Sequence, residues 1–379
     1  MTAKTHVWLG FALLVLTACT EPFSPELKES DQMLVVDGIV TDDPGPYIVK
    51  LSYSGIANEA VTNADVFIVE QDGDRHPLAE HSPGEYRSDS LAFRGQVGKS
   101  YRLEFTLESG GEYETPFQEL LDNPGVDTIT AEAQLRYFDD IQREVNGYEF
   151  QITSNSSENR DHFYFWQMSA TYKYAAEYIT YFIFSDSLIP VAEPDQYNYF
   201  YCWRRDPNNP MAAGSTRGLQ QKKIIRKPLL FVPGDDNKLS LRYSLLVRQY
   251  SVSEQSYEFW EGVIGQGAIS TSLFNTQPYL IKGNVTNVED SAEIVLGNFT
   301  VAGVREKRVY VNRPTEFSLP PTNCILDLEG YESLFLPPVP TGEVLVTVTE
   351  DSSRAIAGGG CIDCRQLGGV ITPPDWWEE

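Results

Sequence analysis

Residues 33–40 read MLVVDGIV, a short run dominated by apolar and β-branched residues. Three further runs of the same kind follow it: YIVKLSY at 47–53, ADVFIV at 64–69 and YRLEFTL at 101–107. Most of these runs alternate apolar with polar positions, which is typical of strands with one buried face. Turn-forming sequences lie between them: DDPG at 42–45, DG at 72–73 and SGG at 109–111. Short strands at this spacing predict a β-sandwich over residues 33–118.

The rest of the chain is also strand-like, with one exception. A connection rich in Asp, Asn, Pro and Gly follows the sandwich, and short apolar or aromatic runs then recur through a second domain at 119–350. The exception is a helix that Ser253 can cap. Tyr257, Trp260 and Ile264 recur at helical spacing and form one apolar face of this helix.

Composition limits the class of protein. Of 379 residues, 41% are hydrophobic and 12% are aromatic, so the chain can bury sizeable cores. We predict an all-β protein: an N-terminal sandwich, a larger β-rich domain with one short helix, and a tail at 351–379 that contains Gly and Cys. The 54 acidic residues outnumber the 29 basic ones, for a net charge of −25. Because such a chain repels a phosphate backbone, we expect no nucleic-acid partner.

The N-terminus has the pattern of an exported, lipid-anchored protein. An apolar run at 7–16 is too short to span a bilayer comfortably and fits the core of a signal peptide at 1–18. It ends in LTAC at 16–19, which resembles the bacterial lipobox, whose Cys receives a diacylglyceryl group. The alternative is an ordinary signal peptide with a coincidental Cys. We expect acyl chains on Cys19 to hold the protein in a lipid bilayer, with residues 19–32 as an acidic tether.

The N-terminal strands resemble a known type of sandwich. The similar stretches are VTNADVFI at 61–68, PGEY at 83–86 and VGKSYRL at 97–103. They look like the immunoglobulin-like sandwiches of the transthyretin or carboxypeptidase-regulatory type, which implies the same fold for residues 33–118.

A second resemblance covers nearly the whole chain after Cys19. Its stretches are VVDG at 35–38, YCW at 201–203, RYSLLVRQYS at 242–251, YEFW at 257–260, CIDCR at 361–365 and PDWW at 374–377. Their order resembles the Bacteroidota outer-membrane lipoproteins catalogued as domain of unknown function 4249. That family implies an outer-membrane lipoprotein, often encoded beside TonB-dependent receptors, and it brings no established catalytic residues.

From these features we expect a non-catalytic protein on the cell surface that binds a ligand or partner as an accessory to a TonB-dependent transporter. Two alternatives stay open. One is an envelope enzyme that acts on glycans or peptides through carboxylates paired in space. The other is a structural or adhesion protein of the surface layer.

Little of the chain matches a catalytic or cofactor-binding pattern. It has four His, and neither paired His nor a Gly-x-Ser-x-Gly sequence surrounds them. Asp72 and Asp74 could contact Ca²⁺, but the further ligands of a calcium loop do not follow them, so we interpret this sequence as a solvated turn. We expect no metal, no cofactor and no enzymatic activity.

Four cysteines remain besides Cys19. They are Cys202, Cys324, Cys361 and Cys364. In an oxidising envelope an even number of Cys favours structural disulfides, and two bridges can pair these four residues in three ways. A redox pair at 361–364 and a zinc site built from all four are the alternatives.

Residues 162–203 contain an unusual density of aromatic residues, 15 of 42. Tyrosine joins an apolar ring to a polar hydroxyl, which suits a recognition surface. The binding candidates are Tyr172, Tyr174, Tyr178, Tyr199, Tyr201 and Trp203. The alternative is a sandwich core with tyrosine hydroxyls at its rim.

Basic residues gather directly after this aromatic stretch. The binding candidates among them are Arg204, Arg205, Lys222 and Lys223. On so acidic a chain, a basic patch would attract an acidic ligand or partner. A solvated hairpin whose charges protect an edge strand is the alternative.

Overall fold

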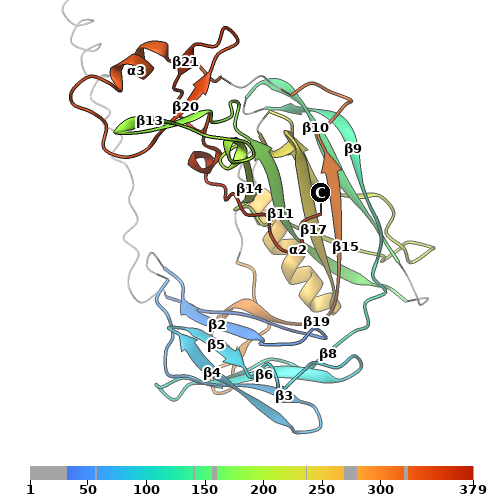
Figure 1. Ribbon diagram of the computed structural model, residues 1–379. Coiled ribbons are helices and arrows are strands. Elements are labelled where there is room, and N and C mark those ends of the chain that lie inside the picture. Colours follow the sequence, from blue (N-terminus) through green and yellow to red (C-terminus); the bar gives the residue numbers. More distant parts are fainter. Residues whose placement is uncertain are drawn as a thin grey trace, which may run out of the picture.

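The computed structural model describes residues 32–378, except 56–57, 140, 156–159, 236, 269–279 and 320–322. Strands dominate the described residues, which confirms the predicted all-β class (Figure 1). Cys19, the predicted signal peptide and nearly all of the predicted tether lie outside them. Within the described part of the chain, none of the helices is both long and apolar enough to cross a membrane.

Early and late strands together build a sandwich-like N-terminal unit. The early strands are β1 (Leu34–Thr41), β2 (Ile48–Tyr53), β3 (Asp65–Glu70), β4 (Arg75–Ser82), β5 (Glu85–Ser88), β6 (Ser100–Thr106), β7 (Glu112–Glu114) and β8 (Gln118–Glu119). The late strands are β18 (Thr286–Asn287) and the first part of β19 (Leu296–Asn312). Every second side chain of β6 is buried, as the alternating sequence predicts. The core of this unit extends beyond residues 33–118, because it includes Val285, Phe299 and Val301.

Strand β19 joins the N-terminal unit to the rest of the molecule. Its first part lies parallel to β1, with Val35 opposite Leu296 and Thr41 opposite Ala302. Its second part lies antiparallel to a strand of the central sheet. One 17-residue strand therefore belongs to two units, and a boundary at residue 118 cannot separate them.

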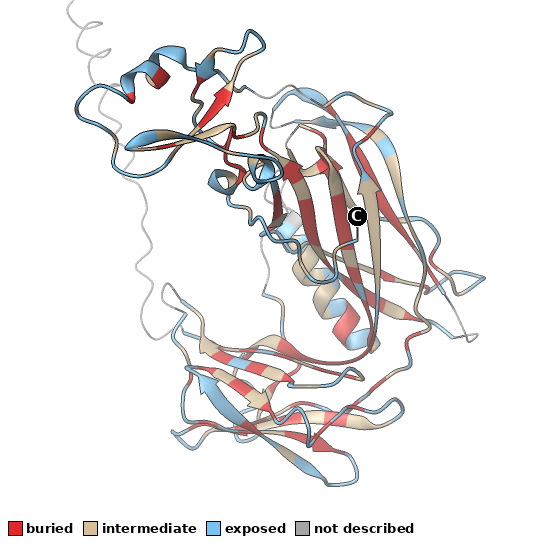
Figure 2. Cartoon of the chain, in the orientation of Figure 1, coloured by how far each residue is buried: buried red, intermediate tan, exposed pale blue. Residues whose placement is uncertain are grey.

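The central unit consists of two facing sheets. Its strands are β9 (Val126–Phe138), β10 (Arg143–Ser154), β11 (Phe163–Ala175), β14 (Tyr201–Arg205), β15 (Met211–Ser215), β16 (Lys227–Pro233) and β17 (Arg242–Ser251). The main sheet has the order β14–β11–β17–β19, with β15 also paired to β11, and the smaller sheet has the order β16–β10–β9. Phe150, Trp166 and Leu245 are fully buried between them. Figure 2 shows the buried positions along the strands of the main sheet.

Helix α2 (Glu254–Ala268) covers part of the opposite face of the main sheet. The predicted helix is confirmed, and so is its cap, because the Ser253 hydroxyl accepts a hydrogen bond from the Ser256 N–H at 3.2 Å. Tyr257 is buried and Trp260 partly buried against strands β11 and β19. We call this side the outer face of the main sheet.

A small third unit includes the start of the predicted tail. It contains β12 (Phe182–Ser185), β13 (Ser187–Pro190), β20 (Val344–Val348), β21 (Arg354–Ala355) and α3 (Leu328–Ser333). Short 3₁₀ helices complete the structure: η3 (Asp195–Tyr197), η4 (Asn237–Leu239) and η6 (Cys364–Leu367). Phe184, Tyr331 and Val346 form the core of the third unit.

Two disulfides attach the tail to the body, which confirms the predicted pair of bridges. Cys202 of β14 bonds Cys364, and Cys324 bonds Cys361. The two Cys of the CIDC sequence therefore do not pair with each other. All four thiols are in these bridges. Neither a redox pair at 361–364 nor a zinc site built from the four Cys therefore has the free thiols that it needs.

An arginine-lined cleft as the candidate functional site

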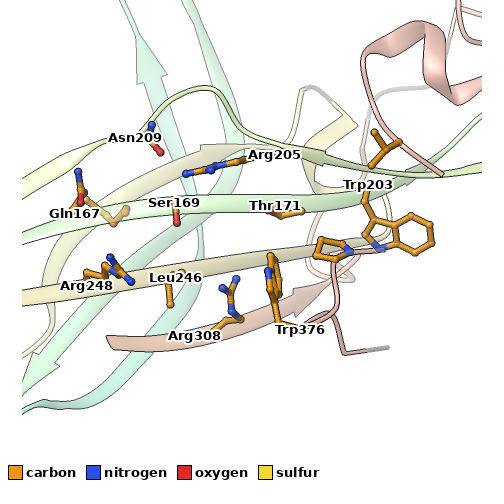
Figure 3. Close-up of a pocket in the computed structure, with 13 residues that line it drawn as sticks. Gln167, Ser169, Thr171, Trp203, Arg205, Asn209, Leu246, Arg248, Arg308 and Trp376 are labelled. Carbon is orange, nitrogen blue, oxygen red and sulfur yellow. The ribbon is translucent and has the colours of Figure 1, made fainter. Parts of the chain in front are cut away.

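A cleft of about 580 Å³ lies on the outer face of the main sheet, beside the tail (Figure 3). Strand β11 supplies Gln167, Ser169 and Thr171 to its floor. These residues face outward because successive side chains of a strand point to opposite faces, and the intervening Met168 and Ala170 fill the core. The floor is therefore the polar half of an alternating strand, and its exposure decreases from Gln167, which is exposed, to Thr171, which is buried.

The neighbouring strands continue the floor in cross-strand rows. In one row Ser169 pairs with Leu246, and Leu246 pairs with Arg308. In the next row Gln167 pairs with Arg248. The tail forms one wall through Val370, Pro374 and Trp376, and the segment after β14 forms another through Asn209.

Three guanidinium groups reach this cleft from three strands: Arg205 from β14, Arg248 from β17 and Arg308 from β19 (Figure 3). The Arg308 guanidinium lies 3.6 Å from the ring centre of Trp376 and donates to the Ser244 hydroxyl at 2.9 Å. Desolvation by these neighbours lowers the pKa of Arg308 below its ordinary value, although an arginine remains charged. Its charge is therefore held in place and incompletely solvated.

The other two arginines are more open to solvent. Arg248 Nε donates to a carboxylate oxygen of Glu306 at 3.0 Å at the edge of the cleft. Arg205 is exposed and has no acidic partner among the described residues. Thus two of the three guanidinium groups can still donate hydrogen bonds to a ligand.

The cleft has the opposite charge to the chain as a whole. Among the described residues that line it, three are Arg and none is Asp or Glu. The whole sequence has nearly two acids for each base. A concave site lined by one sign of charge concentrates ligands of the other sign. The geometry therefore suits an anion, which fork-shaped guanidinium groups bind through paired hydrogen bonds.

The structure separates the predicted binding residues. Trp203 and Arg205 line the cleft, although Trp203 is mostly buried. Arg204 instead donates to the Leu367 carbonyl at 2.6 Å and holds the tail. Tyr172 and Tyr174 are core residues, so they do not form part of a recognition surface. For these two tyrosines the core alternative is correct.

The remaining predicted tyrosines lie away from the cleft. Tyr178 is half-buried and donates to the Cys324 carbonyl at 3.4 Å. The Arg365 guanidinium covers the ring of half-buried Tyr199, at 4.0 Å. Tyr201 is exposed at the sheet edge. These side chains pack the junction between the third unit, the tail and the sheet.

The two predicted lysines do not join the arginines. Lys222 pairs with Asp161 at 2.6 Å, and Lys223 pairs with Asp127 at 2.8 Å. Their charges are thus balanced locally, as expected for a solvated hairpin.

The predicted turn at residues 72–73 carries acidic groups close together. Carboxylates of Glu70, Asp72 and Asp74 lie within 4.8 Å of one another. The Lys99 ammonium contacts Glu70 and lies 3.4 Å from Asp72, and His76 Nε2 lies 3.0 Å from Glu70. Lys99 and His76 thus already contact this cluster, and Asp72 and Asp74 are exposed, which agrees with its interpretation as a solvated turn.

Sequence reasoning missed Arg248, Arg308 and Trp376. In RYSLLVRQYS the alternation places Arg248 on the face opposite Leu245 and Val247. The sequence alone could therefore have shown that Arg248 points away from the core. The convergence with Arg308 depends on the pairing of β17 with β19. Nothing local in the sequence specifies that pairing.

Fold and site together describe an all-β protein with a basic cleft on one face of its main sheet. The chain belongs to the family described as "Domain of unknown function (DUF4249)", whose model matches residues 20–308. The match runs from the segment before β1 into the second part of β19.

No curated protein matches the chain. Among solved structures, one titled "Biofilm associated protein - BSP domain" is similar at 6% identity and a TM-score of 0.14. The alignment covers 77% of this chain and 62% of that one, so the chain spans less than two thirds of its length.

Proposed function

We propose that this protein is a non-catalytic, lipid-anchored protein of the outer-membrane surface that binds an anionic ligand for a TonB-dependent transporter. The observation that carries the binding role is the arginine-lined cleft. Arg205, Arg248 and Arg308 converge there without a lining carboxylate, on a chain of net charge −25. Evenly spread charges would not produce such a site.

The chemistry of the lining favours binding over catalysis. Its polar groups are amides, hydroxyls and guanidinium groups, which orient and hold an anion. General acid–base work needs a group that titrates near the working pH, such as His or a perturbed carboxylate. The described lining residues include neither. Trp376, which is exposed and lies against Arg308, adds apolar surface at one end of the cleft.

Features outside the cleft support the other two parts of the proposal, the lipid anchor and the transporter. The LTAC sequence at 16–19 supports lipid attachment at Cys19. The strongly acidic chain would be repelled by an anionic lipid surface, so the body should stand off the bilayer on its tether. A protein held beside the membrane with its cleft open is suited to capture ligand and transfer it to a transporter.

Binding can be tested with citrate, a polyanion without an apolar part. We expect the full chain in a non-ionic detergent to bind citrate saturably, with an affinity that falls as salt is added. The double variant Arg205→Gln/Arg248→Gln should weaken binding at least about tenfold, since a hydrogen bond to a charged group contributes about 1.5–3 kcal/mol. The matched control Lys222→Gln/Lys223→Gln removes two charges elsewhere and should bind as the parent does. Equal losses in both variants would contradict an anion site in the cleft.

The transporter role needs a separate measurement. An affinity tag inserted at Gly110, in an exposed turn with no neighbour within 4 Å of a Cβ there, leaves the tail free. We expect a TonB-dependent transporter to co-purify with the tagged protein from native membranes. Recovery of the lipoprotein alone, under conditions that preserve other outer-membrane complexes, would refute this part.

A further inference from the structure

A second groove adjoins the arginine-lined cleft. It has a volume of about 480 Å³ and lies between helix α2 and strands β1, β11, β17 and β19. Its walls include Phe165, Tyr250, Phe259, Trp260 and Val263. We call it the aromatic groove. Its lining is mainly apolar, in contrast to the polar floor of the cleft.

Gln167 lines both cavities. The Tyr250 hydroxyl donates to the Gln167 side-chain oxygen at 3.4 Å, at the boundary between the two. Asn209 of the cleft and Met211 of the groove lie only two residues apart along a second shared edge. The two cavities are therefore neighbouring parts of one depression.

The character of this depression changes steadily along the strands. Outward-facing residues of β11 read Thr171, Ser169, Gln167 and then Phe165. The rings of Phe165 and Tyr250 are stacked at 4.4 Å. The polar end thus passes directly into an aromatic floor.

The apolar part has a defined far end. Trp260 of α2 donates through Nε1 to the Thr300 hydroxyl at 3.2 Å and stacks on Phe165 at 4.8 Å. Beyond it the groove passes Asp37 and Asn298, which face each other across the β1–β19 pair, and its last lining residues on these strands are Val35 and Gly297. Along β19, Thr300 lies six positions from Glu306, which is in the row of Arg248, or about 20 Å at the rise of a strand.

We propose that the ligand is an anionic amphiphile, with its acidic head on the arginines and a single apolar chain of about 20 Å along the aromatic groove. This inference rests on the proposed function and specifies its ligand. A compact polyanion would leave the aromatic groove unused. A neutral lipid would leave the three guanidinium groups of the cleft without an anionic ligand.

A series of straight-chain carboxylates tests the inference. The full chain carrying Cys19→Ser is purified without detergent, because a detergent would itself compete for the groove. Hexanoate, decanoate and tetradecanoate are titrated by calorimetry, with decanol and citrate as comparisons. We expect affinity to rise up to about fourfold per added methylene until the groove is filled, the limit set by complete burial of each methylene. The heat-capacity change should become more negative in the same order.

Variants separate the two ends of the site. Arg205→Gln should weaken decanoate binding and leave decanol, which binds weakly, little changed. Val263→Gln places an amide in the groove and should weaken tetradecanoate much more than hexanoate. Glu258→Gln is the matched control on the exposed side of α2 and should bind the series as the parent does.

The outcomes distinguish this inference from the function on which it rests. If citrate binds but affinity does not change with chain length, the amphiphile is wrong and the anion site stands. If neither citrate nor any carboxylate binds, both proposals fail. Decanol binding as tightly as decanoate would overturn the assignment of the acidic head. An acidic oligosaccharide that binds tightly and is insensitive to Val263→Gln would replace the amphiphile with a glycan.

Discussion

Asn123 links the N-terminal unit to the main sheet through four hydrogen bonds of one buried side chain. Its amide N–H groups donate to the carbonyls of Gln249 at 2.7 Å and Gly303 at 2.9 Å. Its oxygen accepts from the Gly125 N–H and from the Gln249 side chain, both at 2.9 Å. We expect Asn123→Ala to lower the free energy of unfolding by about 3 kcal/mol, because buried groups lose their partners. Urea denaturation measures this, and exposed Asn208→Ala should change stability by less than about 0.5 kcal/mol. Similar midpoints for both variants would contradict this role.

Asp37 carries an electrostatic cost that depends on pH. Although solvent reaches part of its side chain, the groove walls desolvate the carboxylate and raise its pKa, and the nearby charge of Lys50 opposes this only partly. The charged form is thus less favourable in the folded than in the unfolded protein. We expect Asp37→Asn to be more stable than the parent at neutral pH. The gain should shrink as the pH falls through the raised pKa, where the parent carboxyl becomes protonated.

Urea midpoints of both proteins at a series of pH values measure this difference. Asp43→Asn controls for the loss of one negative charge, because Asp43 is exposed and lies outside the groove. A gain that is constant with pH would show that the substitution acts through packing and not through charge.

At the level of single residues, sequence reasoning succeeded where a local rule decides the outcome. Ser253 as a helix cap follows from the residues beside it. Tyr174 was harder to place, because its hydroxyl donates to the Cys364 carbonyl, 190 residues away. A tyrosine on an alternating strand fits either face until its hydrogen-bond partner is known.

Strand β19 depends on Gly297, which packs directly against the backbone of Val36 in β1. This glycine has a φ of +84°, and a Cβ there would lie 1.9 Å from the Val36 carbonyl oxygen. We expect Gly297→Ala to destabilise the protein far more than Gly218→Ala. Gly218 also has a positive φ but has open space around it, so its variant should show only the backbone cost of about 1 kcal/mol. Urea denaturation of the two variants separates steric overlap from backbone strain, and equal losses would refute a close-approach role.

The tail is held as a wall of the cleft by the Cys202–Cys364 disulfide. Further along the chain, Val370 of the tail forms an antiparallel backbone bridge with Trp203. We expect Cys202→Ala/Cys364→Ala to lower the free energy of unfolding by about 2–4 kcal/mol and to weaken citrate binding, since the wall is released. Denaturation and calorimetry measure the two effects.

The second disulfide provides the comparison for this prediction. Cys324→Ala/Cys361→Ala should also lower stability, but it leaves the Cys202–Cys364 bond and the wall in place. Citrate binding should therefore persist in this variant. Unchanged binding after loss of Cys202–Cys364 would show that the cleft does not need the tail.

Individual strands and the helix could be predicted because their periodicity is local. The partners of the strands could not. The parallel pair of β1 with β19 joins residues about 260 positions apart, and alternation within either strand does not specify the other. The same limit applies to the cleft, whose three arginines become neighbours only when β14, β11, β17 and β19 are ordered in one sheet.

At the scale of the whole molecule, net charge and anchor act against each other. A chain of charge −25 is repelled by anionic lipid, so it remains at a membrane only if something else holds it. We propose that acyl chains on Cys19 do so, each buried methylene contributing about 0.8 kcal/mol. Cys19→Ser removes the acceptor thiol and should move the protein from the membrane to the soluble fraction. Fractionation followed by immunoblotting measures this, and Thr17→Ser, a conservative change in the same sequence, should remain with the membrane. Retention of Cys19→Ser on membranes washed with high salt would mean that a surface of the folded body, and not a lipid, makes the attachment.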